Sequence, residues 1–204
     1  MSPRLGVVCA LLLTLVGYSL SSGWTTSAAP LAGPDQRASM PSVGPVSPPT
    51  TDAAMMTSAM SAAPEAVSKD ATIVAMDDKM QLRTLRKGTN GWTCMPDGPS
   101  PGVDPMCLDK NGLDWAMAWL AHKAPTAGKM GFGYMLMGGS DASNTDPFAM
   151  QPNPGERWVD TGPHVMVFNI GTMFDGYPTT PANPKAPFVM FPNTPYAHLM
   201  LPVK

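Results

Sequence analysis

The fold is decided at residues 72–94, TIVAMDDKMQLRTLRKGTNGWTC. Two short apolar runs, 72–76 and 80–85, flank a polar turn at Asp77-Asp78-Lys79, and runs rich in β-branched residues and bounded by polar turns are typical of strands. Asn90-Gly91 is a strong hairpin signal ahead of Trp92-Thr93-Cys94. This region therefore predicts a three-strand meander at the start of a folded domain.

The chain beyond residue 94 predicts one helix and four further strands. Residues 113–123 carry an apolar face, Asp109 or Asn111 is placed to cap the start of this helix, and Pro125 stops it. Four short apolar segments bounded by Gly or Pro have the length of strands, namely 132–137, 164–170, 188–191 and 197–203. We therefore predict an α+β fold that is mostly β, with an antiparallel sheet or partly open barrel and one packed helix.

Two cysteines lie close together in the predicted domain. Cys9 belongs to an apolar N-terminal run, whereas Cys94 and Cys107 flank a proline-rich segment. In an oxidising compartment such a pair forms a disulfide, and the segment between them is too rich in proline to be a helix or a central strand. A redox-active or metal-binding thiol pair is the alternative, but the C-x-x-C spacing is absent.

The N-terminal third of the chain predicts export. Residues 1–28 have the layout of a secretory signal peptide, with Arg4, an apolar run and then small residues; an uncleaved anchor is the alternative. Residues 29–70 lack aromatic residues and any sustained apolar period, which predicts a flexible tether in which only 53–60 suits a short helix. Residues 71–204 then form a single β-rich domain held by the disulfide. We expect a periplasmic or secreted protein with no integral membrane domain once the signal is cleaved.

Charge and motifs exclude several classes of function. With 13 basic and 15 acidic residues, the chain has no basic surface large enough to bind nucleic acid. There is no metalloprotease motif, phosphate loop or dinucleotide fingerprint, and Ala142 breaks the nucleophile elbow that Ser140 would need. The sequence therefore favours a protein that is not an enzyme. The alternative is a small secreted hydrolase that uses Ser140 or an aspartate with His164.

Methionine is the compositional anomaly, with 18 in the chain. Two lie in matching phrases, His164-Val165-Met166 and His198-Leu199-Met200. Residues i and i+2 of a strand share a face, so each phrase points an imidazole and a thioether the same way. If the two strands are neighbours, His164, Met166, His198 and Met200 form a soft pocket suited to copper. The alternative, which needs no cofactor, is that methionine fills an irregular core and each histidine bonds a loop carbonyl.

An oxygen-rich loop is the main candidate for ligand binding. Its polar side chains are Ser140, Asp141, Asn144 and Asp146, with His164 on a later loop. The spacing does not match a calcium-binding EF-hand, and a loop closed by Asx turns is the alternative. Long polar loops on a stapled scaffold predict a non-enzymatic binding module for a small molecule or an envelope protein.

Six motifs carry a resemblance to known sequences. They are GTNGWTCMPD at 88–97, DPMCLD at 104–109, GYMLMGG at 133–139, ASNTDPFA at 142–149, GPHVM at 162–166 and TPYAHLM at 194–200. Through them the chain resembles a group of uncharacterised bacterial exported proteins, over nearly all of the predicted domain and none of the tether. The resemblance implies export and a single domain, and it implies no activity, cofactor or site residue.

Overall fold

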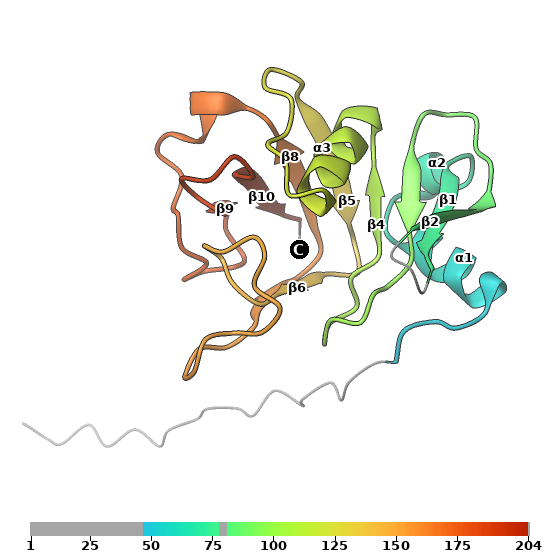
Figure 1. Cartoon of the computed structure of the whole chain (residues 1–204), viewed down its shortest axis with the longest axis horizontal. Coiled ribbons are helices and arrows are strands. Elements are labelled where there is room, and N and C mark those ends of the chain that lie inside the picture. The colour runs from blue at the N-terminus through green and yellow to red at the C-terminus, as the bar shows by residue number, and fades with distance from the viewer. Residues whose placement is uncertain (1–46, 78–80, 204) are drawn as a thin grey trace, which may run out of the picture. The chain divides into compact units, whose positions relative to one another are not determined.

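The computed structural model describes residues 47–77 and 81–203, so the predicted signal peptide and the first part of the tether lie outside the described residues. The described chain is mostly β (Figure 1). Its elements are α1 (Asp52–Ser61), α2 (Glu65–Ser68), β1 (Thr72–Met76), β2 (Leu82–Arg86), β3 (Thr93–Met95), β4 (Met106–Leu108), α3 (Lys110–Leu120), β5 (Gly131–Met135), β6 (Gly139–Asp141), β7 (Val159–Thr161), β8 (His164–Phe168), η1 (Gly171–Phe174), β9 (Phe188–Met190) and β10 (His198–Pro202).

One large sheet organises the fold. Its strand order is β2-β1-β3-β4-β5-β8-β10-β9, and β6 and β7 form a separate hairpin below it in Figure 1. The sheet is mixed, because β1 and β3 run parallel while the other pairs are antiparallel, and it does not close into a barrel. The predicted α+β, mostly β class is confirmed, as are the four strands predicted after the helix. Three strands, β4, β6 and β7, were not predicted, since each has only three residues beside turn-forming segments.

The predicted three-strand meander is wrong in its third strand. β1 and β2 form an antiparallel hairpin, but β3 pairs with the other edge of β1, where Thr72 lies opposite Thr93. The cause lies at Gly88, whose missing side chain lets the chain cross directly over the backbone that leads into β1. Its N–H donates to the Thr72 hydroxyl at 3.0 Å. The turn at Gly91, with φ of 79°, therefore leads into a parallel neighbour of β1.

The predicted helix exists and begins three residues earlier than expected. The Asp109 side chain accepts the N–H of Gly112 at 2.7 Å, which caps α3 as predicted. The helix ends where His122 takes a left-handed φ of 53° and the N–H of Lys123 donates to the carbonyl of Ala118 at 2.8 Å. This is a Schellman arrangement, in which a residue other than glycine supplies the left-handed turn.

The predicted tether is wrong for residues 51–70, because α1 and α2 pack against the sheet; the short helix that the sequence allowed at 53–60 is present as α1. Thr51 caps α1, and Ala59 and Ala62 are fully buried beside Cys94 and Cys107. The segment buries small side chains where a typical amphipathic helix buries large ones, so its sequence has no strong apolar period. Small residues allow the helix backbone to approach the sheet closely. The ordered domain thus begins about 20 residues before the predicted boundary.

The predicted disulfide is confirmed and marks one face of the sheet. Cys94 and Cys107 are directly opposed on β3 and β4 and are bonded to each other. Cys107 packs with α1, whereas the next residue, Leu108, packs with Trp115 of α3. Successive residues of a strand point to opposite faces, so α1 and α3 cover opposite faces of the sheet. Within residues 47–77 and 81–203, no helix combines the length and apolar character needed to cross a membrane.

Candidate functional site

The two His-x-Met phrases lie on neighbouring antiparallel strands, β8 and β10. In this register Met166 is opposite Met200, while Met135 of β5 is opposite His164. Directly opposed residues share a face, so the three thioethers and the imidazole of His164 project from one face of the sheet. All four side chains are buried, and His164 is 0% exposed. One buried histidine therefore shares its face of the sheet with three thioethers.

The hydrogen bonding of His164 determines what its ring can do. Its Nδ1 lies 2.7 Å from the carbonyl oxygen of Gly162. A carbonyl only accepts, so Nδ1 carries the proton and donates it, which leaves the lone pair on Nε2. Nε2 is buried and has no hydrogen-bond partner within the described part of the chain. Burial lowers the pKa of His164 below its usual value, so the ring is neutral and Nε2 is a free electron-pair donor.

The β6–β7 hairpin covers this imidazole. A Cβ placed on Gly139 would lie 3.1 Å from Cε1 of His164 and 3.6 Å from the sulfur of Met135. The edge of the imidazole and the Met135 thioether therefore both lie against the backbone of Gly139, which has no side chain. Thr161 is directly opposite Gly139, and its buried hydroxyl also has no partner among the described residues. The site thus combines one nitrogen donor, thioethers and an unpaired hydroxyl beneath a hairpin.

His198 lies at the other end of the same face. His198 is opposite Phe168, and Phe168 lies four residues along β8 from His164. The backbones of His164 and His198 are therefore about 13 Å apart along the strand direction. The Nδ1 of His198 lies 3.0 Å from the carbonyl of Tyr196, and its ring packs 5.1 Å from that of Trp115. Burial lowers the pKa of His198 to about 4. The spacing favours a site centred on His164 over one that joins both histidines.

Ser140 and Asp141 lie in the hairpin beside His164, but Ser140 faces a different partner. Its N–H donates to Asp104 at 2.9 Å, and its hydroxyl donates to the same carboxylate. The hydroxyl of Ser100 also donates to Asp104. Ser140 and His164 share no hydrogen bond, so the geometry does not assemble the nucleophile and base of a hydrolase. Burial, with a smaller contribution from Asp104, raises the pKa of Asp141 to about 7.

Asn144 and Asp146, the other two predicted ligand residues, hold their own loop together. The Asn144 amide donates to the carbonyls of Thr179 and Val189 at 2.8 and 3.4 Å. Asp146 accepts the N–H of Phe148 at 2.9 Å, which is an Asx turn. These hydrogen bonds hold the loop in place, and none involves His164.

Sequence reasoning left Met135, Gly139 and Thr161 out of the candidate site, because they join His164 only through strand register. In the described part of the chain, no three side chains of the His, Cys, Asp and Glu types gather at one point. The strand register instead places one imidazole and three thioethers on the same face of the sheet. Comparisons with protein families, curated proteins and solved structures find no match for this chain.

Proposed function

We propose that this protein is an exported, non-enzymatic binding module and that its ligand is Cu(I), held by Nε2 of His164 with the thioethers of Met135, Met166 and Met200. One observation carries the proposal: Nε2 is a buried, unpartnered electron-pair donor in a neutral ring. A buried polar atom without a partner is costly, and a bound ion would offset that cost. Export is supported by the disulfide and by the predicted leader.

The tautomer of His164 supports metal binding specifically. Histidines that bind metals commonly donate the other ring N–H to a backbone carbonyl, which fixes the ring and raises the basicity of the ligating nitrogen. The 2.7 Å contact from Nδ1 to Gly162 is such a bond. The proposal therefore rests on an orientation of the ring and not only on the presence of histidine.

The thioethers support the choice of metal. Thioether sulfur is a soft, neutral ligand that suits Cu(I), whereas Zn²⁺ sites use thiolate, imidazole and carboxylate. Met135 is the cross-strand neighbour of His164, and Met166 is two residues along the same face. A neutral ligand set leaves one positive charge uncompensated with Cu(I) but two with a divalent ion, so burial penalises the monovalent ion less.

A competition titration against a coloured Cu(I) chelator, with ascorbate as reductant so that the disulfide is retained, tests the proposal. We expect the wild-type chain to withdraw one Cu(I) ion and His164→Leu to withdraw none. Met135→Leu and Met166→Leu should weaken the affinity about tenfold or more, by loss of a ligand. His122→Asn, at an exposed histidine outside the site, is the matched control and should retain the ion.

Two further measurements keep the result interpretable. Circular dichroism and thermal unfolding of the apo variants show whether His164→Leu is folded. His198→Phe distinguishes the site centred on His164 from one that needs both histidines, and we expect it to bind Cu(I) normally. Equal Cu(I) binding by the wild type and folded His164→Leu, or no withdrawal by the wild type, would refute the proposal.

A further inference from the structure

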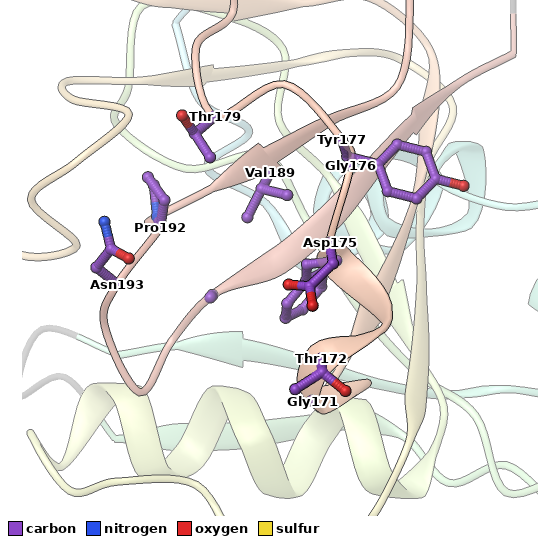
Figure 2. A pocket seen from close by; sticks show the side chains of 11 residues that line it. Gly171, Thr172, Asp175, Gly176, Tyr177, Thr179, Val189, Pro192 and Asn193 are labelled. Carbon is purple, nitrogen blue, oxygen red and sulfur yellow. The ribbon is translucent and has the colours of Figure 1, made fainter. Parts of the chain in front are cut away.

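A second candidate site lies on the opposite face of the sheet. A cavity of about 320 Å³ lies between η1, the segment that follows it, and the chain around β9 and β10, and Figure 2 shows the side chains that line it. Its lining includes Gly171, Asp175, Thr179, Val189, Asn193 and Ala197. Leu199, next to His198, is opposite Val189 and shares its face. The cavity is thus separated from the His164 site by the sheet itself.

The walls of this cavity are fixed by specific contacts. The buried amide of Asn144 donates to the carbonyls of Thr179 and Val189, and so joins two of the lining residues. Gly171 and Asn193 hold left-handed φ angles of 58° and 61°, which bend the chain at two edges of the cavity. The N–H of Asp175 donates to the carbonyl of Thr172 at 3.0 Å. These contacts fix the shape of the cavity.

The chemistry of the lining is an unpaired anion over an apolar floor. Asp175 is exposed and is the one charged residue of the lining, and its carboxylate has no hydrogen bond or ion pair within residues 47–77 and 81–203. Val189 and Ala197 supply apolar surface and pack in a cluster with Phe174. Figure 2 shows Val189 between Asp175 and Asn193.

We propose that this cavity binds a small organic cation, a primary ammonium carried on a short aliphatic chain. The ammonium lies against the carboxylate of Asp175, the aliphatic chain lies over Val189, and the amide of Asn193 receives a second polar end. An exposed ion pair alone contributes little, so the apolar floor supplies the remaining affinity and the selectivity for a chain over a bare ion. This site is independent of Cu(I) binding at His164.

Backbone amide shifts in a ¹⁵N spectrum, recorded during titration with 1,5-diaminopentane, test the proposal on the whole metal-free protein. Pentan-1-ol, which lacks the charge, and pentanoate, which reverses it, are the matched probes. We expect saturable shifts at residues 171–179 and 189–197 with the diamine, at least tenfold weaker binding of the alcohol, and no binding of the acid.

Two variants make the outcome decisive. Asp175→Asn should lower the affinity for the diamine at least tenfold, whereas Asp160→Asn, which removes an exposed carboxylate on β7, should leave it unchanged. Ala197→Leu fills the floor and should weaken binding without a change of charge. Unsaturable shifts spread over all acidic residues, equal effects of the two aspartate variants, or an absence of shifts at the lining would overturn the proposal.

Discussion

We expect acidification to destabilise the folded chain through His198. Its ring is 4% exposed and lies among Trp115, Phe168 and Phe191, with ring centroids 5.1, 5.3 and 5.6 Å away. Burial, the largest cause, lowers the pKa of His198, the backbone contact to Tyr196 raises it, and the charge of His164 lowers it further, so the pKa falls from 6.5 to about 4. The unfolded chain therefore takes up a proton near pH 6.5, and the folded chain does so only near pH 4.

The magnitude follows from that difference in pKa. His198 stabilises the folded state fully above pH 6.5, and its contribution is lost as the pH falls from 6.5 towards 4. Each tenfold difference in proton affinity corresponds to about 1.4 kcal/mol, so the loss between pH 7.5 and pH 4 is about 3 kcal/mol. His198 is only 4% exposed, so solvent screening reduces this figure little.

Urea unfolding of the metal-free protein between pH 7.5 and pH 4, followed by tryptophan fluorescence, measures this contribution against His198→Phe. Phenylalanine keeps the volume and the aromatic contacts and removes the titration. Asp141 acts in the opposite direction: its pKa of about 7 in the folded chain means that stability is lost as pH rises from 3.8 towards 7. Only the difference between wild type and variant isolates His198.

Between pH 7.5 and pH 4, we expect the free energy of unfolding of the wild type to fall by about 3 kcal/mol more than that of His198→Phe. Asp141→Asn should change the slope in the opposite sense. Parallel curves for the wild type and His198→Phe would refute the assignment of a buried neutral imidazole to His198.

Two further predictions concern the scaffold. Replacing Cys94 and Cys107 together by alanine should lower the free energy of unfolding by about 3 kcal/mol, since the bond closes a loop across a separation of 13 residues; an unchanged urea midpoint would contradict this. Gly88→Ala should destabilise by at least about 2 kcal/mol, because a Cβ there meets the backbone of Ala71, whereas Gly98→Ala, which meets nothing within 4 Å, should stay within about 0.5 kcal/mol. Equal thermal midpoints for the two glycine variants would show that the crossing at Gly88 is not close.

The sequence predicted those parts of the fold that have a local signal. Periodicity identified β5, β8, β9, β10 and α3, and cysteine spacing identified the disulfide. It allowed a short helix at 53–60 but placed it in a flexible tether, because alanines carry little amphipathic signal although Ala59 is fully buried against the sheet. It also misplaced β3, since Asn90-Gly91 specifies a turn and not the partner that the next strand joins.

For the candidate site, too, the sequence predicted only the part that has a local signal. The phrase His164-Val165-Met166 showed from sequence which two side chains share a face. Only the register showed that Met135 lies opposite His164 and that His198 lies opposite Phe168. Which residue of one strand faces which residue of another depends on contacts far apart in sequence, and no local pattern encodes it.

The central claim is that His164 and neighbouring thioethers bind Cu(I), and X-ray absorption at the copper edge of the loaded protein tests it most directly. The account predicts an edge typical of Cu(I) and a shell of one nitrogen with two or three sulfur scatterers, and this sulfur signal should weaken in Met135→Leu. A shell of nitrogen and oxygen alone, or one unchanged in His164→Leu, would contradict it.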